Sequence, residues 1–302
     1  MLLAATALGL CLLLLATVVP DRLARATWPQ RAPAYALLLW QALGLAGGLL
    51  AVETALTVAL APAGLHSLAA GLPGTGSLGA LGALPWWSYA AGLVAIMLLA
   101  RLLSVLLAST VKTLSARHRN RVLVDLVATR NPLLAKTRVV DHDVPLAYCL
   151  PGLRPRVVLS RGVLDLLRED EVRAVLAHER AHIEQRHDLV VLPFVALGRA
   201  FPHLTGVRVA QQAVALLIEM LADDRAVRHH PRAVLARALY KVGTAQAPAG
   251  GLGAAGDGVL LRAQRLVGPP AVLGAMARTA VILATALVLA LPVLGLLVPF
   301  AP

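Results

Sequence analysis

Two histidines and a glutamate stand at a spacing typical of metal-dependent hydrolysis. His178, Glu179 and His182 form a His-Glu-x-x-His sequence. Residues four apart lie one turn above each other on one face of an α-helix, so both imidazoles can reach a single zinc ion (Zn2+). Glu179 then lies beside that ion, where its carboxylate can take a proton from an attacking water molecule. The motif predicts two metal ligands and a general base.

The sequence around this motif predicts a helix. No Gly or Pro interrupts the chain from Glu169 to Arg186, and its apolar residues recur with a helical period. Three acidic residues open the segment, where they complement the positive end of the helix dipole: Glu169, Asp170 and Glu171. The alternative is a polar surface helix that holds no metal.

A third metal ligand must come from another segment, because catalytic zinc usually has three protein ligands and an open position for water. Glu219, in a predicted helix from Val207 to Arg228, is the residue that we expect in this role. Asp223, one turn later, can accept a hydrogen bond from a ligating histidine and fix its orientation. The alternative is a solvated helix end, since Asp224 and Arg225 follow.

Two other groups have the composition of a metal site. A helix continued past His182 would turn His187 about 140° away from it, so we expect His187 and Asp188 to end the helix and to lie at the surface. The run Asp141 to Asp143 lies between two short predicted strands, which favours a turn.

The composition predicts an integral membrane protein, because 58% of the 302 residues are hydrophobic and only 15% are charged. Four apolar stretches reach the length of roughly 20 residues that crosses a bilayer: residues 2–19, 34–61, 84–109 and 271–300. We therefore expect three transmembrane helices in residues 1–110, a zinc domain in residues 111–270, and a fourth transmembrane helix with a short tail in residues 271–302.

Basic residues predict the orientation of these spans in the cell membrane. The first loop carries Arg22, Arg25 and Arg31, whereas the loop 62–83 holds no Asp, Glu, Lys or Arg. A second basic cluster follows the third span: Arg101, Lys112, Arg117, Arg119 and Arg121. Both clusters favour a cytoplasmic zinc domain with the N- and C-termini outside. No basic residue precedes the first stretch, which therefore predicts a retained span rather than a signal peptide.

The net charge of +12 does not require a nucleic-acid partner. Arginines at membrane boundaries can pair with anionic lipid headgroups, so the lipid bilayer is the expected partner and direct nucleic-acid binding is not expected. Cys11 lies in a span and Cys149 in the polar domain, so no disulfide and no cysteine-type metal site is expected.

Two features of the second span favour contacts inside a helix bundle. Glu53 is costly to expose to hydrocarbon, so it should face the bundle interior or a water-filled cavity. Gly44 and Gly48 form a small-residue pair that can bring helices close.

The polar domain should combine a small sheet with helices. Short apolar runs at 137–140, 146–149 and 156–159 are separated by turn residues and predict strands. Ser160 can cap a short helix that ends at Leu167. The segment from Leu189 to Ala200 is too short for a span and contains Pro193, which predicts a buried or interfacial segment near the membrane. The Gly-rich and Ala-rich stretch from Ala247 to Gly258 predicts a flexible loop.

With these motifs in place, the chain resembles the BlaR/MecR family of membrane metallopeptidases, the protease part of bacterial beta-lactam sensor-transducers. The matching residues run from Pro145 to Ser160, from Glu171 to His182, and through Arg186-His-Asp188, with Glu219-x-x-x-Asp223 completing the pattern. The order of three spans, a zinc domain and a final span also matches. HtpX-type membrane proteases share the same core motifs.

The resemblance implies a gluzincin-like α+β fold, zinc held by His178, His182 and Glu219, and Glu179 as general base. It also implies cleavage of a cytoplasmic protein, which in that family is a winged-helix repressor or the protease itself. The antibiotic sensors carry a penicillin-binding domain after the last span, and no Ser-x-x-Lys motif follows it here. We therefore do not expect direct beta-lactam sensing through such a domain.

Three functions remain open from the sequence. The expected one is a membrane-embedded zinc endopeptidase that cleaves a cytoplasmic protein in regulatory signalling. One alternative is an HtpX-like protease for quality control of membrane proteins. The other is a non-catalytic membrane scaffold that keeps a zinc site for stability.

Overall fold

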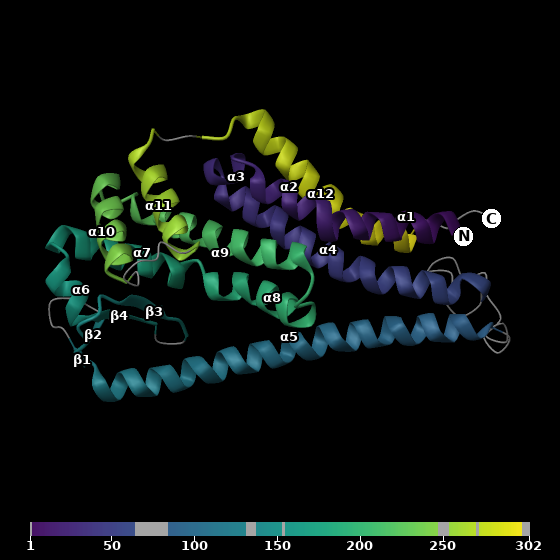
Figure 1. Cartoon of the computed structure of the whole chain (residues 1–302), viewed down its shortest axis with the longest axis horizontal. Helices are drawn as coiled ribbons and strands as arrows, with labels where there is room; N and C mark the ends of the chain where they lie inside the picture. Colours follow the sequence, from purple (N-terminus) through teal and green to yellow (C-terminus); the bar gives the residue numbers. More distant parts are fainter. Residues whose placement is uncertain are drawn as a thin grey trace.

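The computed structural model describes residues 2–63, 84–130, 137–152, 155–246, 254–269 and 272–297. Most of these residues are helical, and a small sheet joins the helices of the polar domain (Figure 1). The expected mainly helical membrane protein with a small sheet in its polar domain is therefore confirmed. Most of the predicted outer loop 62–83 and the tail 298–302 lie outside the described residues.

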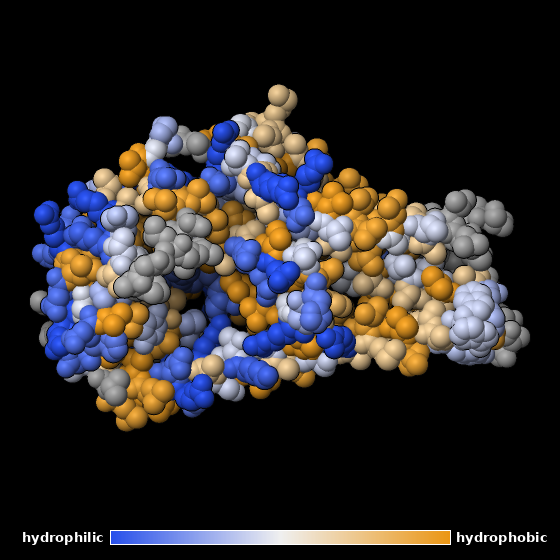
Figure 2. Space-filling view, viewed as in Figure 1, coloured by the Kyte–Doolittle hydropathy of each residue, from blue (hydrophilic) through white to orange (hydrophobic). Residues whose placement is uncertain are grey.

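Four helices are long and apolar enough to cross a membrane, and their ranges are Ala5–Arg25, Pro33–Leu60, Trp86–Leu126 and Ala275–Gly295. The first comprises α1 (Leu2–Leu13), a π-helical segment η1 (Leu14–Val18) and α2 (Val19–Arg25). The short helices α3 (Trp28–Arg31) and η2 (Ala61–Ala63) flank the second, α4 (Pro33–Leu60). Hydrophobic residues dominate the end of the molecule that these helices build (Figure 2). The four spans make this a multi-pass membrane protein.

The third span continues well beyond the predicted end of its apolar stretch. Helix α5 (Trp86–Val127) has 42 residues, because neither Gly nor Pro interrupts it after Gly92. It runs the length of the molecule to the sheet (Figure 1), where Val124 packs against Leu150 and Val158. One helix thus connects the membrane part with the polar domain.

The sheet has four strands in the order β1-β2-β4-β3. Strands β2 (Thr137–Val140) and β4 (Arg156–Ser160) are parallel, whereas β1 (Thr129–Arg130) and β3 (Ala147–Leu150) pair antiparallel with β2 and β4 respectively. The three predicted strands are confirmed to within one residue at each end. Strand β3 is left at an edge of the sheet.

One face of the sheet supports the helix that carries the motif. Val157 and Leu159 of β4 pack against α6 (Arg161–Leu166) and against Val172 and Val175 of α7 (Glu169–Glu184). The hydroxyl of Ser160 accepts a hydrogen bond from the Val163 N–H at 3.2 Å, as expected for the cap of α6. The Gly-free helix α7 is thereby fixed between sheet and helices.

Helices α8 (His187–Ala200) and α9 (Thr205–Ala226) form a pair that packs against span α4. The Gln41 side chain of α4 donates a hydrogen bond to the Val190 carbonyl of α8 at 2.8 Å. Gly44 of α4 faces Leu197 of α8 in this contact. Gly48 faces a different helix, because its neighbour is Leu102 of α5. The predicted interfacial segment is thus a helix in contact with a membrane span.

Two further helices follow, α10 (Arg232–Gln246) and α11 (Ala254–Val267), before the fourth span α12 (Ala275–Leu297). The predicted loop 247–258 is wrong over its last five residues, which belong to α11, while residues 247–253 lie outside the described chain. Glycine costs about 1 kcal/mol in a helix interior. Burial of Leu266 and the contacts of Arg262 favour the helix despite that cost.

Glu53 is buried with 6% exposure and faces α12, where its carboxylate lies against Gly295. The prediction that this residue points into the bundle agrees with its position.

Candidate active site

The structure brings His178, His182 and Glu219 together. The two Nε2 atoms lie 3.2 Å apart, one helical turn from each other on α7. The Glu219 carboxylate of α9 lies 3.4 Å from His178 Nε2 through Oε2 and 3.5 Å from His182 Nε2 through Oε1. These atoms form a group that could hold a metal ion.

The packing of α7 and α9 determines how close Glu219 lies to the two histidines. Val172, Val175 and Leu176 of α7 are buried on the side that faces the sheet and α10. Leu217 and Ile218 of α9 are buried in a cluster with span α4. Glu219 follows this apolar pair directly, so the burial of its neighbours turns the carboxylate toward the motif.

The donor set fits zinc. Histidine nitrogen and carboxylate oxygen lie about 2.0–2.2 Å from zinc, and in a tetrahedral site such ligands are roughly 3.3–3.5 Å apart. The three separations of 3.2, 3.4 and 3.5 Å are close to this range. Among the described residues this group offers three protein ligands, which is the usual number in a catalytic zinc site, whereas a closed structural site has four.

Asp223 lies next to the His178 ring. Its Oδ1 is 3.0 Å from His178 Nδ1, and the Asp223 side chain is completely buried. The contact has the distance of an ion pair but is poorly aligned for a hydrogen bond. It leaves His178 Nε2 directed toward Glu219 and His182.

Arg262 of α11 is a functional candidate that the sequence did not single out. Its Nε and Nη2 donate to the two oxygens of Asp223, each at 2.8 Å, and its Nη1 lies 2.8 Å from Glu219 Oε2. The Arg262 side chain is only 8% exposed. Arg262 therefore binds both Glu219, the predicted third metal ligand, and Asp223, the carboxylate next to His178.

His187 does not lie at the surface, and this expectation was wrong. The residue is buried, and its Nδ1 lies 2.9 Å from His182 Nδ1. Helix α7 ends at Glu184, and Arg186 adopts a left-handed conformation with φ of 50°, so the chain turns before His187. The turn brings His187 back to the motif, while Asp188 forms an ion pair with Arg117 of α5 at 2.6 Å.

Electrostatics favour ionised carboxylates in this group. Burial opposes the charge of Glu219 and Asp223, but His178 and Arg262 outweigh it and lower the pKa of each carboxyl to about 2. Burial lowers the pKa of His182 to about 4, which leaves this ring neutral at neutral pH. Both states suit metal ligands, which must be deprotonated.

His178 behaves differently. Burial opposes its protonation, but Asp223 and Glu219 raise its pKa to about 9. Metal binding at this ring must therefore release a proton.

Glu179 lies on the side of α7 that faces strand β3. Burial raises the pKa of its carboxyl, and the nearby Cys149 backbone N–H works against that shift. Burial, together with the charge of Glu179, raises the pKa of the Cys149 thiol to about 12. Cys149 thus remains a protonated thiol near the site. Because a metal ligand must be deprotonated, we do not expect Cys149 to bind the metal.

Asp141, His142 and Asp143 form the predicted turn. The two carboxylates pair with Arg161, each at 2.6 Å, and the His142 ring accepts a hydrogen bond from the Val144 N–H at 3.1 Å. This turn is separate from the group of His178, His182 and Glu219.

Comparison with known proteins places this site in a peptidase context. The model of peptidase family M48 matches residues 113–247, a range that contains the motif, Glu219 and Asp223. The chain is 32% identical over 115 residues to a protease HtpX homolog of Salinibacter ruber. The aligned segment covers 35% of this chain and 41% of that protein.

Two further HtpX homologs match shorter segments. The homolog of Aeropyrum pernix is 42% identical over 72 residues, 23% of each chain. That of Persephonella marina is 35% identical over 89 residues, 27% of this chain and 31% of that protein. The chain thus spans less than half the length of these relatives. No solved structure matches it. Residues 113–247 of this multi-pass membrane protein are similar to the M48 metallopeptidases and to HtpX-type membrane proteases.

Proposed function

We propose that the protein is a membrane-embedded, zinc-dependent endopeptidase that cleaves a cytoplasmic protein. The observation that carries this proposal is the convergence of His178 Nε2, His182 Nε2 and the Glu219 carboxylate at separations of 3.2 to 3.5 Å. The similarity to family M48 supports the reaction class. The basic residues that flank the spans support a cytoplasmic orientation of the site.

The side chains divide the reaction between them. Zinc held by the two histidines and Glu219 would supply Lewis-acid chemistry, which polarises a peptide carbonyl and makes water a stronger acid. Glu179 accepts the proton of the attacking water and passes it to the leaving nitrogen. Its raised pKa suits a group that must both take and return a proton.

Arg262 and Asp223 keep the ligands in place. Their paired, buried charges fix the His178 ring from behind, and the second branch of the guanidinium holds Glu219. Charge-assisted pairs of this kind are short and directional, so they limit the movement of both ligands.

Strand β3 offers a place for the substrate backbone. Within the described residues it pairs with β4 on one side only; it also packs against α7, and the Cys149 backbone lies near Glu179. An extended peptide can add to such an edge through main-chain hydrogen bonds. A peptide bound there passes beside Glu179.

Two biological roles are compatible with this chemistry. We favour regulatory cleavage of one protein, with a winged-helix transcriptional repressor as the candidate, on the basis of the resemblance to the BlaR/MecR family. The similarity to HtpX homologs supports quality-control proteolysis of membrane proteins as the second candidate. Comparison of cleaved proteins in cells with and without the active enzyme separates them, because regulation predicts one or a few products and quality control predicts many.

The Glu179→Gln variant tests the assigned chemistry. The purified protein in detergent should retain zinc but lose hydrolysis of casein, by a factor of about 100 or more. Glu184→Gln is the matched control, since Glu184 lies exposed on the same helix and pairs with Arg225. Substantial turnover by Glu179→Gln contradicts the role of the base. A wild-type protein that binds zinc and cleaves nothing supports the scaffold alternative.

A further inference from the structure

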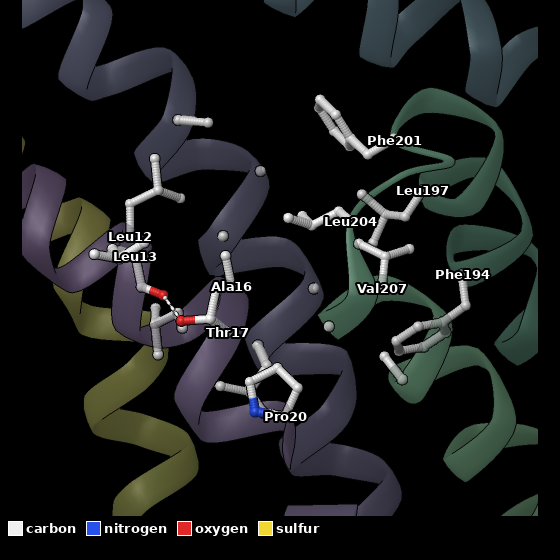
Figure 3. Close-up of a pocket in the computed structure, with 18 of the residues that line it drawn as sticks. Leu12, Leu13, Ala16, Thr17, Pro20, Phe194, Leu197, Phe201, Leu204 and Val207 are labelled. Carbon is white, nitrogen blue, oxygen red and sulfur yellow. Dashed lines mark hydrogen bonds between the residues drawn. The ribbon is translucent and has the colours of Figure 1, made fainter. Parts of the chain in front are cut away.

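An apolar cavity of about 420 Å³ lies between the first span, span α4 and the α8–α9 pair (Figure 3). The first span contributes Leu12, Leu13 and Ala16 on one side, and Phe194, Leu197 and Val207 line the opposite side. This volume falls in the range of roughly 300–1,000 Å³ that is common for ligand sites.

The lining excludes polar ligands. Its surface is almost entirely apolar, and the hydroxyl of Thr17 is already used in a hydrogen bond to the Leu13 carbonyl at 2.7 Å. Water needs two to four polar partners to occupy a cavity stably. The ligand should therefore be a hydrocarbon group.

The backbone around the cavity departs from regular packing. The first span is π-helical from Leu14 to Val18, and such distortions often occur at functional sites. Gly206 at the start of α9 approaches the Ala16 carbonyl so closely that an added Cβ would lie 2.0 Å from it. Gly9 and Gly47 leave open space instead, since a Cβ at either position would meet nothing within 4 Å. The helices are therefore in tight contact at Gly206 but leave empty space at Gly9 and Gly47, which indicates a defined cavity between closely packed helices.

Two exposed arginines lie close in the sequence to lining residues of the cavity. Pro20 of the first span and Gly206 of α9 both line it and lie against each other, and Arg22 and Arg208 follow two residues later in the respective helices. Neither arginine forms an ion pair within the described part of the chain. Their free charges complement a lipid phosphate at the membrane boundary.

We propose that this cavity binds one acyl chain of an anionic phospholipid, with the lipid phosphate at Arg22 and Arg208. Two of the surrounding helices, the first span and α4, are membrane spans, so bilayer lipid has access to this region. Helix α9 carries both Val207 of the cavity and Glu219 of the site, roughly 18 Å apart along a continuous helix. The bound chain thus completes the packing of the helix that presents Glu219.

Photo-crosslinking in nanodiscs tests this site. The full-length Glu179→Gln protein is used, so the outcome is independent of proteolysis. The bilayer contains phosphatidylcholine and a small fraction of phosphatidylglycerol with a diazirine near the end of its acyl chain. Adducts are expected in peptides that cover residues 9–20 and 194–210. Gly47→Leu, which fills the cavity, should reduce them several-fold.

Matched variants separate the cavity from bulk lipid. Gly47→Ala leaves most of the space and should keep the labelling, and Ala100→Leu introduces the same Leu side chain at an exposed position of α5. Gly9→Leu fills the cavity from the first span instead of from α4, and it replaces Gly47→Leu if that variant does not fold. Arg22→Gln with Arg208→Gln should abolish the preference for phosphatidylglycerol over equally labelled phosphatidylcholine.

Three results overturn the proposal. The first is equal labelling at the cavity and along exposed α5 that neither Gly47→Leu nor Gly9→Leu reduces. This result would show that only bulk lipid was labelled. Equal labelling by a diazirine fatty acid without a phosphate removes the headgroup assignment. Preferential labelling by an apolar transmembrane peptide carrying the same diazirine shows that the cavity takes protein instead of lipid.

Discussion

Arg262 and Asp223 form a doubly hydrogen-bonded ion pair in the interior, with Nε–Oδ2 and Nη2–Oδ1 both at 2.8 Å. Asp223 is fully buried and Arg262 nearly so. The two residues are 39 positions apart in the sequence, on α9 and α11. This pair fixes α11 against the helix that carries Glu219.

Removal of the guanidinium should destabilise the fold. In Arg262→Gln the buried Asp223 carboxylate loses its two guanidinium hydrogen bonds and keeps only its contact with His178, and removing one partner of a buried ion pair typically costs about 3–5 kcal/mol. Thermal unfolding of the metal-free protein in detergent measures this loss. Arg265→Gln is the matched control, because Arg265 also forms two hydrogen bonds of 2.8 Å to a carboxylate, through Nη1 and Nη2 to the more exposed Asp224. We expect about 1 kcal/mol or less for the Asp224 pair. Equal losses for the two variants contradict the account of the buried pair.

His187 should strengthen zinc binding through His182. Its ring lies 2.9 Å from His182 Nδ1 and 3.0 Å from the Gln185 side-chain oxygen, so it can fix the tautomer that presents His182 Nε2 to the metal. His187→Ala should weaken zinc affinity about 10-fold to 100-fold, as is typical for residues behind a ligand. Competition with a zinc chelator measures this change. His203→Ala, at an exposed histidine, should leave the affinity unchanged. Unchanged affinity in His187→Ala would show that the contact is structural only.

Local periodicity predicts much of this site. The His178 and His182 pair follows from four-residue spacing on one helix, and Glu219 with Asp223 follows from the same spacing on the next long helix. These features depend only on the spacing of nearby residues along one helix, which can be read from the sequence. Three strands, the cap at Ser160 and the four spans follow from patterns of the same kind.

His187 and Arg262 show what such patterns miss. The position of His187 depends on the left-handed turn at Arg186, a non-glycine residue that the sequence does not mark as a break. Arg262 meets Asp223 through tertiary packing of a helix whose Gly-rich start resembles a loop. Neither contact has a short-range signal. The identity of Glu219 as metal ligand and of Glu179 as base remains a prediction.

Glu171 should stabilise the protein at neutral pH and lose this effect in acid. Burial opposes the charge of its carboxylate, but hydrogen bonds from Lys241 at 2.7 Å and from the Arg168 N–H at 2.9 Å lower its pKa below 4.5. Because the folded state binds this proton more weakly than the unfolded chain, the stabilisation is complete above pH 4.5. It disappears as the pH falls through the lower folded-state value.

The Glu171→Gln variant should therefore be less stable by about 1–3 kcal/mol near pH 7. The difference from wild type should shrink as the pH falls below 4.5. Thermal unfolding across this pH range measures both effects. Glu169→Gln, at an exposed residue paired with Arg173, should change the stability by no more than about 0.5 kcal/mol. A loss in Glu171→Gln that is independent of pH contradicts the charge-based explanation.

X-ray absorption at the zinc edge of the purified, zinc-loaded protein tests the central claim most directly. The account predicts nitrogen and oxygen ligands at about 2.0–2.2 Å with two histidine rings, and a weakened or altered site in Glu219→Gln. A sulfur ligand at about 2.3 Å, or a spectrum that Glu219→Gln leaves unchanged, would contradict the assignment of zinc to His178, His182 and Glu219.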